Sequence, residues 1–239
     1  RRHDNEIAGE PMAPEEVVAH AQASASASIA YTYTEPTIFA EFCYDTALLA
    51  REKGLRNVFV SNGFMTEASA SVIAEVLDGD NIDLKSFSDD FYRKVCKARL
   101  KPVLETITRM KSLGVWVEVT TLVIPGLNDS DAELRDIAQF LHATGPEIPW
   151  HVTAFYPTYK MRDRPPTPLE TLRRARQIGM EAGLRHVYTG NIPGDPGENT
   201  YCPACSELLI ARRGFTVRQN RLTDGACPTC GARIAGVWA

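Results

Sequence analysis

The sequence predicts an α/β fold, a partial β/α barrel of parallel strands followed by a small four-cysteine module. Six apolar, β-rich runs alternate with segments whose apolar residues recur every three or four positions, the period of an amphipathic helix. Glycines follow several helical segments, as at Gly54, Gly114 and Gly183, where a residue with positive φ turns the chain into the next strand. Regular β–α units with short connections form a parallel sheet, closed or partly closed into a barrel. An open doubly wound sheet is the alternative fold.

Each element has an expected position. We predict strands at residues 29–33, 57–60, 81–84, 115–124, 150–155 and 185–188, and helices at residues 39–53, 68–77, 103–113, 132–142 and 168–181. Residues that favour the first turn of a helix stand where helices are expected to begin. Asp129-Ser130-Asp131 precedes one helix, and Pro14 and Pro168 lie where a first-turn proline is tolerated.

Composition is that of a soluble globular protein. The 239 residues are 44% hydrophobic and 23% charged, with a net charge of -4. We expect a barrel domain at residues 1–195 and the four-cysteine module at residues 196–239. The longest apolar runs are well short of the ~20 residues that a membrane helix needs, and no signal-peptide core follows the first residues, so we expect a cytoplasmic protein. The acidic charge balance argues against nucleic acid as a partner.

Four cysteines in two C-x-x-C pairs close the chain: Cys202 with Cys205, and Cys227 with Cys230, with 21 residues between the pairs. This spacing allows four thiolates to surround one tetrahedral zinc ion at about 2.3 Å, so we predict a structural zinc site. A rubredoxin-like iron site uses the same ligands. Disulfides are the third alternative, and nothing marks the chain as secreted.

Between the two pairs, the sequence predicts a β-hairpin. Leu208, Ile210, Phe215 and Val217 have strand-like spacing, and Arg212-Arg213-Gly214 is the predicted turn. The arginines of this region make the module locally basic, but no aromatic stacking platform for nucleic acid accompanies them. We expect the module to pack beside the barrel, completing its wall or forming a surface for a partner. A non-catalytic scaffold that docks partners through this module is one alternative function.

Polar residues follow the predicted strands. They are Glu35, Asn62, Gly63, Asp83, Lys85 and His151, with the loop after Ile124 at the end of the fourth strand. Because the active site of a β/α barrel is built from the carboxyl ends of its strands, we expect these groups to face one mouth. Alternation along a strand places Asp83 and Lys85 on the same face. The sequence therefore predicts a polar pocket for a small molecule.

Several of these residues have other interpretations. Glu35 can cap the helix that follows it. His151 can be a core histidine with satisfied hydrogen bonds. Lys85 can be a Schiff-base lysine in an aldolase-like barrel, the main enzymatic alternative. Cys43 shares an apolar helix face and is expected to serve packing.

The order and spacing of six short motifs resemble the radical SAM enzymes. The motifs are YTYTEP at 31–36, SNG at 61–63, IDLK at 82–85, LVIPGLND at 122–129, PWH at 149–151 and VYTGN at 187–191. More narrowly, the chain is similar to the pyruvate formate-lyase activating enzyme-like group, and its tail resembles the AmmeMemoRadiSam system radical SAM protein. The resemblance covers nearly the whole chain.

The resemblance implies a binding site for S-adenosylmethionine. Glu35 and Pro36 match the motif for its amino group, with Glu35 as the acceptor. Asn62, Gly63, Asp83 and Lys85 match residues on the ribose and carboxylate side of the cofactor. Ile124 corresponds to a backbone and apolar contact with adenine, and His151 to a further pocket residue.

The resemblance also implies a [4Fe-4S] cluster and a 5'-deoxyadenosyl radical that abstracts hydrogen from a substrate, with a reductant protein as electron donor. The substrate, a small molecule or a protein, is not identified by the sequence. One departure concerns the cluster, because the motif C-x-x-x-C-x-x-C is absent, and Cys43 and Cys96 each stand alone. We therefore expect an N-terminally incomplete chain that is inactive by itself, and a natural relative without a cluster is the alternative.

Overall fold

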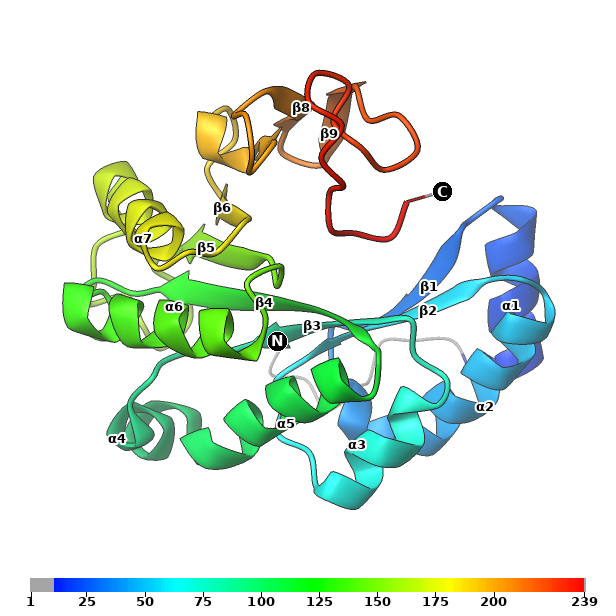
Figure 1. Cartoon of the computed structure of the whole chain (residues 1–239). Coiled ribbons are helices and arrows are strands. Elements are labelled where there is room, and N and C mark those ends of the chain that lie inside the picture. The colour runs from blue at the N-terminus through cyan, green and yellow to red at the C-terminus, as the bar shows by residue number, and fades with distance from the viewer. Residues whose placement is uncertain (1–10, 239) are drawn as a thin grey trace.

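The computed structural model describes residues 11–238, and its centre is a six-stranded sheet (Figure 1). The strands are β1 (Ser28–Tyr31), β2 (Arg56–Ser61), β3 (Gly79–Asp83), β4 (Trp116–Val123), β5 (Trp150–Ala154) and β6 (Val187–Gly190). They lie in sequence order and every neighbouring pair is parallel. The predicted partial β/α barrel is confirmed. The doubly wound alternative is wrong, because that topology requires the strand order to reverse.

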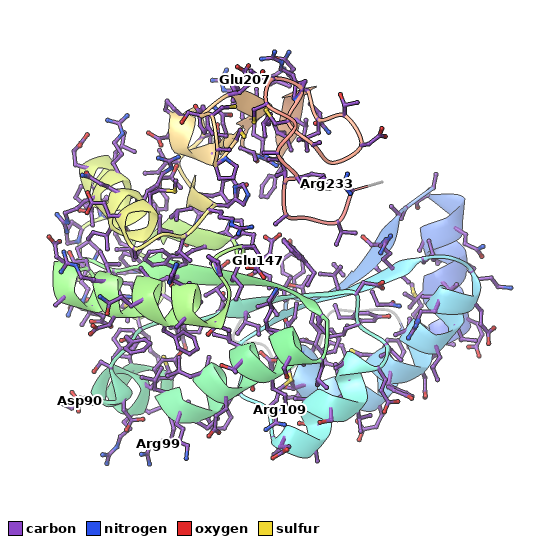
Figure 2. The ribbon with its side chains drawn as sticks, in the orientation of Figure 1. Asp90, Arg99, Arg109, Glu147, Glu207 and Arg233 are labelled. Atoms are coloured by element: carbon purple, nitrogen blue, oxygen red, sulfur yellow. The ribbon has the colours of Figure 1, made fainter. Side chains whose placement is uncertain are left out.

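Helices cover the outer face of this curved sheet (Figure 1). They are α1 (Pro14–Ala23), α2 (Ala40–Glu52), α3 (Glu67–Ala74), α4 (Asp89–Phe91), α5 (Leu100–Ser112), α6 (Asp131–Thr144) and α7 (Leu169–Glu181). Alternate strand residues point outward, and the main core forms where they meet the helices, with side chains filling the space between ribbon layers (Figure 2). Fully buried members include Phe59, Ile82, Ile107, Leu141 and Trp150.

Local sequence accounts for the helix boundaries. Thr66 caps α3 by accepting a hydrogen bond from the Ser69 N–H, and Ser130 caps α6 by accepting one from Glu133. The predicted helices differ from the observed ones by one to a few residues at their ends. The sequence did not predict α4 or the π-helical turn Tyr92–Cys96 that follows it.

The C-terminal module is a three-stranded antiparallel sheet, β7 (Thr200–Tyr201), β8 (Leu208–Arg213) and β9 (Thr216–Asn220). It lies over the face of the large sheet opposite the helices (Figure 1). Its core contains Cys202, Leu209, Ile210, Cys227 and Ile234. The division between barrel and module at residue 196 remains a prediction.

The predicted hairpin turn is displaced. Arg212 and Arg213 belong to β8, and the turn is Gly214-Phe215, because Gly214 adopts a φ of 57° and Arg213 pairs with Thr216. Phe215 stands at the tip with its side chain fully exposed, so its expected place in an alternating apolar strand is wrong. The shift moves Arg212 into a strand that faces the barrel.

Within residues 11–238, no helix is long and apolar enough to cross a membrane.

Candidate functional site

A row of polar side chains crosses the inner face of the sheet. The strand register aligns Asp83 with Thr120, Thr120 with His151, and His151 with Tyr188. Asn62 follows Ser61, which pairs with Ile82 immediately before Asp83. Because neighbouring strands lie about 4.8 Å apart, Asp83 and His151, separated by one strand, are about 10 Å apart. The fold thus brings the predicted residues of β2, β3 and β5 to one level.

Glu35 joins the end of β1 to the end of β2. Its Oε2 accepts a hydrogen bond from the Asn62 N–H at 2.8 Å, and its Oε1 accepts one from the Thr37 hydroxyl at 3.0 Å. Glu35 therefore caps the 3₁₀ turn Pro36–Phe39 and also holds the neighbouring loop. A carboxylate has about four acceptor positions, so it retains capacity for a bound amine.

Gly63 permits the close approach of this loop to β3. It adopts a φ of +68°, and a Cβ atom at this position would stand 2.6 Å from Cγ2 of Ile82. No larger residue fits without displacing the buried isoleucine. The Ser61-Asn62-Gly63 loop is thereby seated against the strand that carries Asp83.

Lys85 is fixed from three directions. Its ammonium group forms an ion pair with Asp83 at 2.7 Å, as expected for residues on one strand face. Its N–H donates to the Tyr92 hydroxyl at 3.0 Å, and its carbonyl accepts from the Asn128 side chain at 2.6 Å. Both charged side chains are about one-third exposed, at 39% for Lys85 and 36% for Asp83, so the pair borders the open mouth.

Ile124 is placed differently from the other predicted residues. Its side chain is buried in the main core. Its N–H donates to Oδ1 of Asn128 at 2.6 Å, and its carbonyl accepts from the Leu127 N–H at 3.0 Å. The loop after β4 thus uses the backbone groups of Ile124 internally, and the structure does not bring Ile124 into the polar row.

His151 has a partner that sequence reasoning missed. Its Nε2 lies 2.6 Å from Oε2 of Glu118, whose other oxygen accepts from the Trp116 indole N–H at 3.0 Å. Burial raises the pKa of Glu118, but the hydrogen bond and charge of His151, with smaller contributions from the Trp116 hydrogen bond and the Arg212 charge, bring that pKa below its ordinary value. The available signal was alternation, because Glu118 stands two residues before Thr120 in a strand.

A buried carboxyl lies behind the row, on the helix side of β3. Asp80 is 1% exposed, its Oδ1 accepts from the Ser61 hydroxyl at 3.0 Å, and its Oδ2 has no partner among residues 11–238. Burial raises the pKa of Asp80 to about 8, the Ser61 hydrogen bond opposes this rise, and the charges of Glu35 and Asp83 add to it. Asp80 therefore holds a proton near neutral pH.

A cleft of about 950 Å³ separates the polar row from the C-terminal module. Its sheet side includes Asn81, Trp116, Glu118, Thr120, His151 and Tyr188, and its module side includes Arg212, Phe215 and Trp238. The Tyr188 hydroxyl and the Thr200 hydroxyl lie 3.0 Å apart across this boundary. The module therefore forms one wall of a cleft that opens on the row.

The four cysteines of the module converge. Their sulfur atoms all lie within 4.8 Å of one another, with 3.6 Å between Cys202 and Cys230 and 3.7 Å between Cys205 and Cys227. A tetrahedron of sulfurs 2.3 Å from a central ion has edges of about 3.8 Å, so the sulfur positions fit a metal centre. None of these cysteines is in a disulfide.

The other two cysteines do not provide a cluster site. Cys43 is buried, and burial raises the pKa of its thiol to about 12. Burial also raises the pKa of the Cys96 thiol. Metal ligation requires thiolates, which both environments disfavour. The residues of this chain thus do not fit a three-cysteine [4Fe-4S] site.

Comparisons with known proteins agree with this architecture. The sequence profile of the radical SAM superfamily matches residues 1–141. An uncharacterized protein of Methanocaldococcus jannaschii is 46% identical over 233 residues, which cover 96% of this chain and 69% of that protein.

Two solved structures share the fold. A domain of a pyruvate-formate lyase-activating enzyme from Bacteroides vulgatus has a TM-score of 0.60 and 16% identity, covering 70% of this chain and 100% of that one. SuiB of Streptococcus suis bound to S-adenosylmethionine has a TM-score of 0.63 and 11% identity, covering 78% of this chain and 45% of that one.

Proposed function

This chain belongs to the radical SAM superfamily, and from this premise we propose that the ends of β1, β2 and β3 bind S-adenosylmethionine. The observation that carries the proposal is the contact of Glu35 with the Asn62 backbone, one strand away from the Asp83–Lys85 pair. These residues place an amine acceptor, a polar loop and a charged pair along one edge of the sheet, the edge where parallel β/α folds bind ligands.

Each residue has a distinct role in this proposal. Glu35 accepts hydrogen bonds from the cofactor's amino group, and Pro36 orients it by starting the 3₁₀ turn. Asp83 offers acceptors to the ribose hydroxyls, and Lys85 offers an ammonium group to the cofactor's carboxylate. His151 is a further pocket residue through its place in the row, and Ile124, which lies outside the row, acts by shaping the loop after β4.

Members of this superfamily typically pair the cofactor with a [4Fe-4S] cluster, which supplies the electron that generates a 5'-deoxyadenosyl radical. The sequence contains no C-x-x-x-C-x-x-C motif to hold such a cluster. What this chain's residues contribute is orientation of the cofactor and a partly enclosed cleft that limits water at the reacting centre.

The Schiff-base alternative is not favoured by the geometry. The Lys85 side chain is 39% exposed and lies 2.7 Å from the Asp83 carboxylate, whereas a Schiff-base lysine is activated in a hydrophobic pocket or beside another cation. Borohydride trapping with a carbonyl substrate would detect a Schiff base at Lys85 if one formed.

We propose further that the four module cysteines hold a structural zinc ion. The burial of Cys202 and Cys227 and the four-sulfur ligand set support a closed site, which leaves no position for a substrate. Iron at this site is the alternative, and elemental analysis of the purified chain distinguishes the two metals.

The binding proposal is tested by equilibrium dialysis of this chain with radiolabelled S-adenosylmethionine up to millimolar concentration. Glu35→Gln should weaken binding about tenfold or more, since a hydrogen bond to a charged group contributes about 1.5–3 kcal/mol. Glu41→Gln, an exposed change on α2, is the matched control and should leave binding unaltered. Equal affinity in the Glu35→Gln variant and the parent chain, or no saturable binding by the parent, would contradict the proposal.

A further inference from the structure

The cleft between sheet and module contains Arg212 on β8, which cofactor binding does not use, and Glu118 on β4, which holds His151 of β5. His151 belongs to the same row as Asp83, so it lies where the cofactor pocket and this cleft meet. If that row binds S-adenosylmethionine, as proposed above, the cleft is where a substrate would meet it.

Arg212 presents a hydrogen-bonding edge to this cleft. Its Nη1 donates to the Thr200 hydroxyl at 2.6 Å and to the Glu198 carbonyl at 3.4 Å, and its guanidinium lies 5.7 Å from the centre of the Tyr188 ring. These contacts orient the planar group. In the described part of the chain, nothing accepts a hydrogen bond from its Nε or Nη2, and the residue is half-buried. A guanidinium with one fork held and the other open suits two oxygens of an anion.

His151 presents a second open hydrogen-bonding atom. Glu118 engages Nε2, and among residues 11–238 no group is hydrogen-bonded to Nδ1, which leaves that nitrogen for a ligand. The imidazole stacks on Tyr188 with ring centres 5.3 Å apart, which fixes its plane. Both Glu118 oxygens are already hydrogen-bonded, so this carboxylate is compensated.

We propose that this cleft binds a small anionic substrate, whose carboxylate or phosphate pairs with the open edge of Arg212 and whose hydroxyl forms a hydrogen bond with Nδ1 of His151. Trp116 and Trp238 on the cleft wall favour a flat, apolar body between the two polar groups. The module is thus a specificity-determining part of the site, since Arg212 comes from its central strand.

Tryptophan fluorescence provides a direct assay, because two of the three tryptophans line the cleft and the third, Trp150, is fully buried. The probes are 4-hydroxybenzoate, phenyl phosphate and the neutral isostere 4-hydroxybenzamide. We expect one of the two anions to bind at least tenfold more tightly than the amide, and the preferred anion identifies the substrate's acidic group as carboxylate or phosphate.

Arg212→Gln should weaken binding of the preferred anion at least tenfold, and Arg212→Lys, which keeps the charge but loses the fork, should give an intermediate loss. Arg213→Gln is the matched control, because Arg213 is the next residue of β8, is exposed and lies outside the cleft lining. Cobalt spectra of the four-cysteine site establish that each variant retains its module.

Three outcomes would overturn the proposal: 4-hydroxybenzamide binds as tightly as both anions, the affinity for the preferred anion is unchanged in Arg212→Gln, or neither anion binds. If Arg212→Gln loses the cobalt spectrum, the affinity of Arg212→Lys, measured with an intact spectrum, is the test. Unchanged anion affinity in Arg212→Lys would then overturn the proposal. Neither the cofactor nor a cluster is needed in this assay. Its outcome is therefore separable from that of the S-adenosylmethionine test.

Discussion

The barrel and the C-terminal module are stabilised in different ways. The barrel has an extensive apolar core between sheet and helices, with fully buried residues such as Ile107, Leu134 and Trp150. Within residues 196–238, the apolar core of the module contains five buried residues, and two of them are the cysteines Cys202 and Cys227. Since a domain of this size buries too little apolar surface to fold by itself, its stability must come from a bound metal and from contact with the barrel.

The barrel and the module also contribute different residues to the site. Glu35, Asp83 and Lys85 depend on the barrel alone, whereas Arg212 depends on the module. The boundary between the two parts is polar, with Glu198 accepting from the N–H groups of Gly194 and Gly214, both at 2.8 Å. Cofactor binding and substrate recognition should therefore respond differently to loss of the metal.

Metal removal should have the largest effect. Treatment with a chelator, or Cys202→Ser, should disorder β7, β8 and β9 and abolish anion binding at Arg212, since structural zinc in zinc-finger peptides contributes about 10–16 kcal/mol. The barrel should keep its cooperative thermal transition. Hydrogen exchange measures the two regions separately, and Cys96→Ser serves as the control for a cysteine outside the module. Unchanged hydrogen exchange in the module after complete metal removal would contradict the prediction that the module depends on its metal.

Substitution of two buried leucines compares how much apolar packing stabilises the barrel and the module. Leu141 in α6 and Leu209 in β8 are both 0% exposed. Leu141→Ala should reduce the free energy of unfolding of the barrel by about 2–5 kcal/mol. Leu209→Ala should leave that transition in place and increase exchange in the module alone, with weaker metal retention. A global loss of stability from Leu209→Ala would show that module and barrel unfold as one unit.

Asp80 gives the barrel a pH dependence whose effect over a single pH unit is smaller than that of Leu141→Ala. The pKa of its carboxyl is raised from 3.8 to about 8, so the folded state holds a proton that the unfolded state releases between these values. Stability from this group should fall by about 1.4 kcal/mol per pH unit as the pH rises from about 4 to 8. Asp80→Asn should lack this slope. Denaturant unfolding of both proteins at several pH values measures the difference, in which contributions shared by both, such as that of His186, cancel. Parallel pH profiles would refute the assignment.

Much of the barrel was predictable because periodicity is a local property. Trp116–Val123 and Trp150–Ala154 alternate in burial as strands, and the α6 helix has caps and an apolar face in the sequence itself. The π-helical turn Tyr92–Cys96 was not predictable, because its conformation depends on contacts such as that of Tyr92 with the Lys85 backbone. The hairpin turn was misplaced by about two residues because three consecutive polar residues indicate a turn without fixing its register.

Local patterns of residues specify the alternation of strands and helices, the polar residues at the strand ends and the two cysteine pairs, since each depends on residues close together in the chain. Contacts between distant groups depend instead on the three-dimensional packing. The pairing of Glu118 with His151 follows from strand register, and the place of Arg212 beside Tyr188 follows from docking of the module on the barrel. Such contacts arise from packing between segments remote in sequence, which no local pattern of residues encodes.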